Sequence, residues 1–213
     1  CSPTRTALLT GRYQQRAGGL ECAIGTGNVG RYDEAIELAE ARQLGLPAEQ
    51  SVLPTALKKK GYVTGVFGKW HLGDEVNRQR GFDEWLSCED QYRKYYTEDS
   101  LLDDLSDYHH YLVNKGYVPD LEDMGEQTFS REFAANLPIE DSRAMYLADR
   151  TSDFISANKA RPFMVCVGIL EPHPPYENAL SDIHDPSDIT FGKAFMQSPG
   201  KNSSNLNQSR ETE

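Results

Sequence analysis

The stretch Cys1-Ser2-Pro3-Thr4-Arg5-Thr6-Ala7-Leu8-Leu9-Thr10-Gly11-Arg12-Tyr13 opens the sequence and decides how the rest of it is interpreted. Pro3 has no amide hydrogen and a fixed φ, so it suits the first turn of a helix. Residues 6–12 then predict that helix, with Ala7 and Leu8 facing inward and a glycine near its end. Cys1 is thereby placed at a helix N-terminus, where backbone N–H groups and the helix dipole favour a bound sulfate or phosphate.

Several cysteine chemistries compete for this pattern. Arg5 lies about one turn along the predicted helix and can reach back to an anion as a fixed, forked donor. A tyrosine-phosphatase loop needs cysteine and arginine six positions apart, but position 7 is Ala7. An N-terminal nucleophile hydrolase would use Cys1 with its own amine as the base, which leaves Pro3 and Arg5 without a role. The remaining alternative is a buried, inert cysteine on a capped helix, and the length of the run argues against it.

A second motif, Gly61-Tyr62-Val63-Thr64-Gly65-Val66-Phe67-Gly68-Lys69-Trp70-His71-Leu72-Gly73, predicts a strand that ends in a loop. Lys69 and His71 lie two positions apart, so in an extended segment both side chains point the same way at the end of the sheet. Ligands of open α/β sheets bind there, and this pair suits a sulfate and a neighbouring hydroxyl. A Lys-x-His pair alone would more simply be a solvated lysine and a buried histidine. The glycines around it and the following Gly81-Phe82-Asp83 argue for a site.

A third motif, Glu171-Pro172-His173-Pro174-Pro175-Tyr176, directly follows an apolar run. The prolines deny the backbone a helix or a ladder, so they hold the His173 imidazole in a rigid turn. Isolated His-Pro turns are common, but a place at the end of a predicted strand favours a functional histidine.

Alternating helical and strand patterns predict an α/β fold. Residues 163–170 form the strongest strand and are apolar on both faces, as expected at the centre of a covered sheet. The other expected elements are a helix from Pro54 to a stop at Gly61, a strand over residues 62–67, and helices over residues 32–41 and 140–158. The glycine-rich residues 18–31 are interpreted as a surface loop near the site.

Two further segments are predicted to lie outside the core. Residues 92–137 are acidic and aromatic with weak periodicity, which indicates an insertion over the site. His109, His110 and His184 are interpreted as surface residues or as parts of this insertion. Residues 198–213 are polar and rich in Ser and Asn, and no structure is assigned to them.

Composition excludes several classes of protein. The 213 residues suffice for one sizeable core. No stretch approaches the ~20 consecutive apolar residues of a membrane span. The net charge of −11 argues against a nucleic-acid partner. Three of the four cysteines remain if Cys1 is modified, so a full disulfide framework is not expected.

Together, the three motifs resemble the signatures of the type I, formylglycine-dependent sulfatases of the alkaline phosphatase superfamily. The resemblance covers residues 1–90 and 140–176 and implies a sandwich with a mixed, largely parallel central sheet flanked by helices. Residues 1–197 are then expected to be part of the N-terminal catalytic domain. The chain is expected to be an internal fragment, incomplete at both ends.

The resemblance also implies a role for each motif residue. A formylglycine-generating enzyme would convert Cys1 to formylglycine, whose hydrate attacks the sulfur of a sulfate ester. Arg5 would hold the formylglycine side chain, and Lys69 would bind it and the sulfate. His71 would be the partner of the second hydroxyl of the hydrate, which loses its proton as the aldehyde re-forms. His173 would bind the ester and protonate the leaving alcohol. The expected substrate is a sulfated small molecule or glycan.

The family uses a divalent cation, usually Ca²⁺ and alternatively Mg²⁺, to polarise the sulfate. Within this sequence only Cys1, as formylglycine, matches a metal ligand, so the 213-residue chain alone is expected to be inactive. The family also implies a periplasmic, secreted or lysosomal location. Two alternatives stay open: a phosphonate monoester or phosphodiester hydrolase of the same superfamily, and a non-catalytic relative that binds sulfated glycans.

Overall fold

The computed structural model describes residues 1–17, 46, 49–90, 99–123, 125–192 and 195. It divides into two units, Cys1–Ala179 and Leu180–Glu213. The second contains two short 3-10 helices, Ser181–Ile183 and Pro186–Asp188. The predicted loop over residues 18–31, the predicted helix over 32–41 and the polar tail over 198–213 lie outside the described residues.

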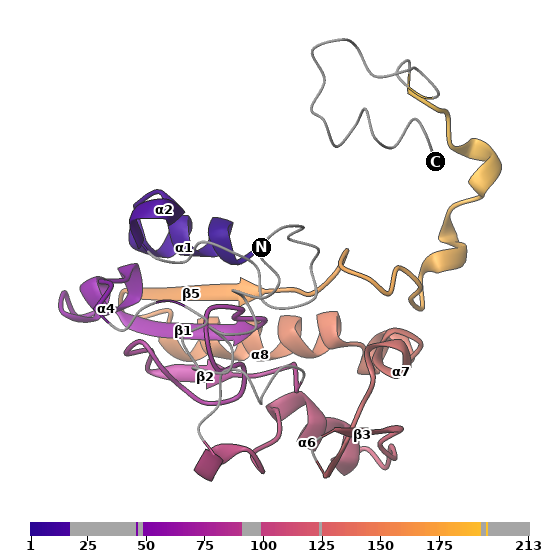
Figure 1. Ribbon diagram of the computed structural model, residues 1–213, viewed down its shortest axis with the longest axis horizontal. Coiled ribbons are helices and arrows are strands. Elements are labelled where there is room, and N and C mark those ends of the chain that lie inside the picture. Colours follow the sequence, from indigo (N-terminus) through magenta and orange to yellow (C-terminus); the bar gives the residue numbers. More distant parts are fainter. Residues whose placement is uncertain (18–45, 47–48, 91–98, 124, 193–194, 196–213) are drawn as a thin grey trace. The chain divides into compact units, whose positions relative to one another are not determined.

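A parallel sheet forms the centre of the first unit (Figure 1). Its strands are β1 (Val63–Gly68), β2 (Glu84–Leu86) and β5 (Phe163–Gly168), in the order β2-β1-β5. β1 pairs with β5 in register from Val63 opposite Phe163 to Gly68 opposite Gly168. The predicted strands and the α/β class are therefore confirmed. Within the described sheet, however, β1 takes the central position that was expected for β5.

Helices and a small hairpin complete the unit (Figure 1). The helices are α1 (Ser2–Thr10), α2 (Gln14–Ala17), α4 (Leu53–Lys58), α6 (Asp107–Asn114), α7 (Arg131–Ala135) and α8 (Arg143–Asn158), and the antiparallel hairpin is β3 (Leu121–Asp123) with β4 (Glu126–Thr128). Short 3-10 turns cover Asp99–Leu101 and Ile139–Asp141. Among the described residues, no helix has the length and apolar character needed to cross a membrane.

The sheet is covered on both faces. Neighbouring residues of β1 point to opposite sides, and Phe67 belongs to one apolar cluster while Val66 belongs to another. The larger cluster contains Phe67, Cys88, Tyr108, Leu112, Phe129, Ala134, Leu137, Tyr146, Leu147 and Phe154. The smaller cluster contains Leu9, Leu46, Val52, Val66, Trp70, Leu72 and Phe82. α8 thus packs on one face and α1 on the other, and β1 between them is held rigidly.

The interpretation of residues 92–137 as lying outside the core was wrong for the part that the structure describes. Tyr108 and Leu112 of α6 are buried in the larger cluster, and Phe129 lies there too. His109 is also buried, so it is not a surface residue, whereas His110 and His184 are exposed. The weak periodicity of this segment reflects elements too short to show a repeat, since α6 spans eight residues.

The first helix is confirmed, but its buried face differs from the prediction. α1 begins at Ser2, with Cys1 as its N-cap, and ends at Gly11, which has a left-handed φ of 66°. Leu8 is 69% exposed, whereas Leu9 is buried. The buried positions Ser2, Thr6 and Leu9 follow a helical repeat that starts at Ser2, the first residue of the helix, rather than at Ala7.

Candidate active site

The loop after β1 meets the N-terminus of α1, although seventy residues separate the two segments. The Cys1 sulfur lies 2.5 Å from Nδ1 of His71. The Ser2 hydroxyl donates a hydrogen bond to the His71 carbonyl oxygen at 2.9 Å, and the Arg5 guanidinium donates one to the Lys69 carbonyl oxygen at 2.7 Å. The structure therefore brings together four of the five predicted site residues, Cys1, Arg5, Lys69 and His71.

His71 reaches Cys1 by a different backbone path from the one predicted. We expected Lys69 and His71 to point the same way because they would lie in an extended segment. Instead β1 ends at Gly68, and His71 adopts a φ of 57° in the left-handed region. Such a φ is uncommon in residues other than glycine, so neighbouring contacts must hold the loop in this conformation.

Burial sets the charge of the site. Burial lowers the pKa of His71 to about 3, and Lys69 adds to this effect. Burial also lowers the pKa of Lys69, while the carboxylate of Glu89 acts in the opposite direction. His71 is therefore neutral near pH 7, which leaves one ring nitrogen able to accept a hydrogen bond.

Two glycines allow β1 and β5 to approach closely where the site begins. The Lys69 amide donates to the Gly168 carbonyl oxygen at 2.8 Å. A Cβ at Gly168 would lie 2.3 Å from the Lys69 carbonyl oxygen, and one at Gly68 would lie 2.4 Å from the Gly168 carbonyl oxygen. The position of Lys69 thus depends on the absence of a side chain on both strands.

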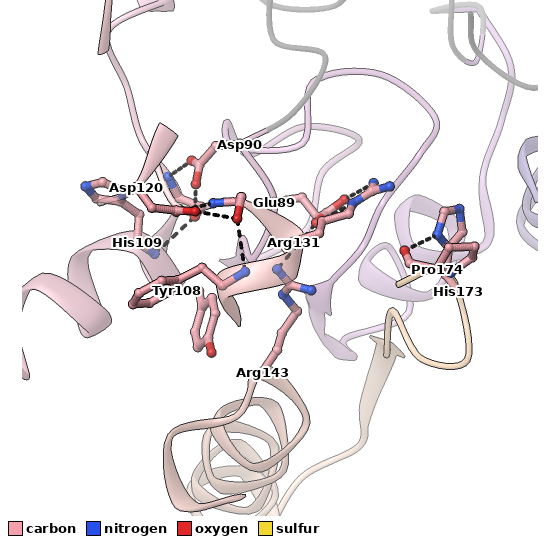
Figure 2. A network of polar contacts seen from close by, with 12 residues as sticks. Glu89, Asp90, Tyr108, His109, Asp120, Arg131, Arg143, His173 and Pro174 are labelled. Carbon is pink, nitrogen blue, oxygen red and sulfur yellow. Dashed lines mark hydrogen bonds and ion pairs between the residues drawn. The ribbon is translucent and has the colours of Figure 1, made fainter. Parts of the chain in front are cut away.

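His173 lies in the predicted turn after β5. Its amide donates to the Leu170 carbonyl oxygen at 3.0 Å, and its Nδ1 lies 2.9 Å from the Pro174 carbonyl oxygen. The side chain is half-buried, and Figure 2 shows it on the side of the polar network where Arg131 lies. Its placement at the end of a strand agrees with the prediction, and its catalytic role stays a prediction.

Sequence reasoning missed an ion network beside this site, shown in Figure 2. Glu89 is buried three residues beyond β2 and accepts hydrogen bonds from Nε and Nη2 of Arg131, the former at 3.3 Å. Nη2 of Arg143 lies 3.6 Å from the same carboxylate. Burial raises the pKa of Glu89, but the two guanidinium groups outweigh it and leave that pKa lowered. The one sequence signal was an acidic residue shortly after a short strand, which is too common to single out.

The donors around Cys1 do not form a calcium site by themselves. Ca²⁺ takes six to eight oxygen ligands, whereas the side chain that contacts the Cys1 sulfur is the His71 imidazole, and its neighbours are the Ser2 hydroxyl on His71 and the Arg5 guanidinium on the Lys69 carbonyl oxygen. Across the described residues, no group of three or more His, Cys, Asp or Glu side chains is arranged to hold a metal ion. The predicted cation therefore has no role that can be derived from these residues.

Comparisons with known proteins agree with the three motifs. The Sulfatase family model matches residues 1–192. Human N-acetylgalactosamine-6-sulfatase is 40% identical over 89 residues, which cover 40% of this chain and 16% of that protein. Human arylsulfatase G is 28% identical over 194 residues, which cover 82% of this chain and 32% of that protein. The chain thus spans between about a sixth and a third of the length of these relatives.

Solved structures resemble the chain more loosely. One, from work on glycosaminoglycan metabolism by Bacteroides thetaiotaomicron, has a TM-score of 0.47 at 19% identity and covers 83% of this chain and 42% of its own. Another, a complex with D-glucosamine-2-N,6-O-disulfate, has a TM-score of 0.43 at 21% identity and covers 81% and 25%. The family model spans most of the sequence, including every motif residue described above. The chain therefore belongs to the sulfatase family.

Proposed function

We propose that the protein hydrolyses sulfate esters and that Cys1, once oxidised to formylglycine, carries the nucleophile. One observation supports this most strongly: the thiol of Cys1 at the N-terminus of α1 lies 2.5 Å from Nδ1 of His71 in the loop after β1. An oxygen in place of the sulfur would still lie within hydrogen-bonding reach of that imidazole.

The reaction needs a nucleophile, an anion site, an acid and a base. Formylglycine, as its hydrate, supplies the hydroxyl that attacks sulfur, giving its proton to solvent, and the second hydroxyl through which sulfate is released. The N–H groups at the start of α1 and the Lys69 ammonium attract the sulfate oxygens. His173 gives its proton to the alcohol oxygen as the sulfur–oxygen bond of the ester breaks. The neutral His71 then takes the proton of the second hydroxyl as the carbon–oxygen bond to sulfate breaks.

The substrate is proposed to be a sulfated small molecule or glycan. Several neighbours of Cys1 are suited to a group with a full negative charge. Lys69 and Arg5 bring an ammonium and a guanidinium group, both of which bind anions. A neutral ester would gain nothing from these cations, which supports an anionic ester as the substrate.

Mass spectrometry of the Cys1 peptide from the full-length protein, made in its native host, tests this proposal. Conversion of the thiol to an aldehyde lowers the mass by about 18 Da. That loss, together with release of sulfate from an aryl sulfate, is the expected result. An unconverted thiol in a host that has the modifying enzyme would overturn the formylglycine mechanism. A converted protein that cleaves an aryl phosphonate faster than the matching aryl sulfate would replace the sulfatase proposal with its nearest alternative.

A further inference from the structure

A buried carboxylate lies behind the His71 loop and has no part in the reaction described above. Glu75 follows His71 by four residues and is 6% exposed. Its Oε1 accepts a hydrogen bond from the His71 amide at 2.5 Å, and its Oε2 accepts one from the Trp70 amide at 2.8 Å. Two consecutive backbone N–H groups thus converge on one carboxylate, an arrangement by which backbone loops bind anions.

The segment that carries Glu75 is itself held in place. The indole Nε1 of Trp85 on β2 donates to the Glu75 carbonyl oxygen at 3.3 Å. The Asp74 carboxylate accepts from the amides of Val76 and Asn77 at 2.8 and 2.9 Å. Because the backbone on both sides of Glu75 is tied, its carboxylate is a fixed anchor rather than a mobile surface charge.

The Trp70–His71 segment that this carboxylate binds has a backbone conformation that neighbouring contacts must stabilise. His71 has a φ of 57°, and a left-handed conformation is unfavourable for a residue with a Cβ. The His71 carbonyl oxygen is held by the Ser2 hydroxyl at 2.9 Å, while the His71 amide is held by Glu75. The residue is therefore fixed from the two ends of its own backbone, with the imidazole directed at Cys1.

We propose that Glu75 is a positioning residue of the active site: its carboxylate fixes the backbone of Trp70 and His71 and thereby sets the imidazole of His71 against the residue 1 side chain. Its effect on rate rests on the proposed sulfatase function. Its effect on the imidazole does not, because the geometry involves residues of this chain alone.

A glutamine cannot replace this carboxylate. Burial raises the pKa of Glu75 to about 7, while the hydrogen bonds from the Trp70 and His71 amides favour the ionised form. Both backbone partners are donors, and the ionised carboxylate offers an acceptor to each. A glutamine offers one oxygen and one NH₂ group, so one of the two amides would face another donor. An unsatisfied buried donor is destabilising, so the contacts that offset the left-handed φ of His71 would be weakened.

The test uses the full-length protein with Glu75→Gln and, as a matched control, Glu84→Gln, which alters an exposed carboxylate on β2. For an aryl sulfate, we expect Glu75→Gln to lower kcat about 10- to 100-fold while KM changes much less, because a misplaced catalytic group slows chemistry more than binding. Glu84→Gln should leave both constants unchanged. A Glu75→Gln protein with the wild-type kcat would overturn the proposal.

Two measurements do not depend on turnover. In protein with ¹³C-labelled histidine, assigned with His71→Asn, we expect the His71 ring resonance at a fixed neutral pH to shift in Glu75→Gln and to stay in place in Glu84→Gln, because only the first change releases the His71 backbone from its anchor. A His71 resonance at the wild-type position in Glu75→Gln would overturn the proposal even if the wild type proved to lack sulfatase activity. Should Glu75→Gln fail to fold, hydrogen exchange in the wild type decides: the Trp70 and His71 amides should be protected as well as β1, and exchange as fast as an exposed loop would refute the anchor.

Discussion

Nδ1 of His71 lies 2.5 Å from the sulfur of Cys1, and the contact joins two segments that are seventy residues apart. The helix that carries Cys1 also donates to the backbone on either side of Trp70, through Arg5 to Lys69 and through Ser2 to His71. These contacts therefore hold the helix and the loop after β1 together.

Neutral His71 should make stability depend on pH. Burial lowers its pKa to about 3 in the folded protein, whereas in the unfolded chain it is near 6.5. The contribution is thus fully present above pH 6.5 and is lost as the pH falls toward 3. From pH 8 to pH 4, we expect the wild type to lose a few kcal/mol more unfolding free energy than His71→Asn. Urea titrations at both pH values measure this, and parallel pH profiles of the two proteins would contradict it.

Glu89→Gln should destabilise the protein strongly. Removing one partner of a buried ion pair leaves uncompensated charge and typically costs about 3–5 kcal/mol, and here two guanidinium groups would lose their partner. Asp153→Asn is the matched control, because it breaks an exposed pair with Arg150 that is worth less than about 1 kcal/mol. Chemical denaturation compares them, and equal effects would show that the Glu89 network contributes no more than a surface pair.

Gly168→Ala should disturb the site through the backbone. The new Cβ would lie 2.3 Å from the Lys69 carbonyl oxygen, which also accepts the Arg5 hydrogen bond. The strands must separate, so we expect both a lower thermal midpoint and a loss of activity in the full-length protein. Gly192→Ala is the control, since nothing described lies within 4 Å of its Cβ. A Gly168→Ala protein that matches this control in both measurements would show that the close approach is not required.

Asp83 should support the sheet through an ion pair and a backbone contact. Its carboxylate accepts from the Thr64 amide at 2.9 Å and lies 2.6 Å from Lys58 Nζ. The hydrogen bond from Lys58 is the main reason that the pKa of Asp83 is lowered, so its contribution is present at neutral pH and is lost as the pH falls through that pKa. Because the pair is partly exposed, we expect Asp83→Asn to cost about 1 kcal/mol at pH 7 and less at pH 3. A cost that grows on acidification would reverse the sign of this prediction.

Local signals in the sequence were enough to predict α1, α4, α8, β1 and β5, and four of the residues that meet in the site. Pro3 marks the start of α1, the glycines and β-branched residues mark β1, and Pro162 precedes β5. These features act within a few residues of themselves, through fixed φ values, missing side chains or side-chain shape. A sequence therefore shows them without any knowledge of the fold.

The tertiary structure alone decided which face of α1 is buried, that α6 joins the core, and what Glu75 and Glu89 do. Glu89 binds Arg131, which lies forty-two residues further along the sequence. Glu75 binds amides whose direction depends on the φ of His71. A single acidic residue has the same local pattern whether it is solvated or buried. Its role is fixed by the low polarity and by the donors that the folded chain brings to it, because only burial makes an unpaired charge costly enough to require those partners.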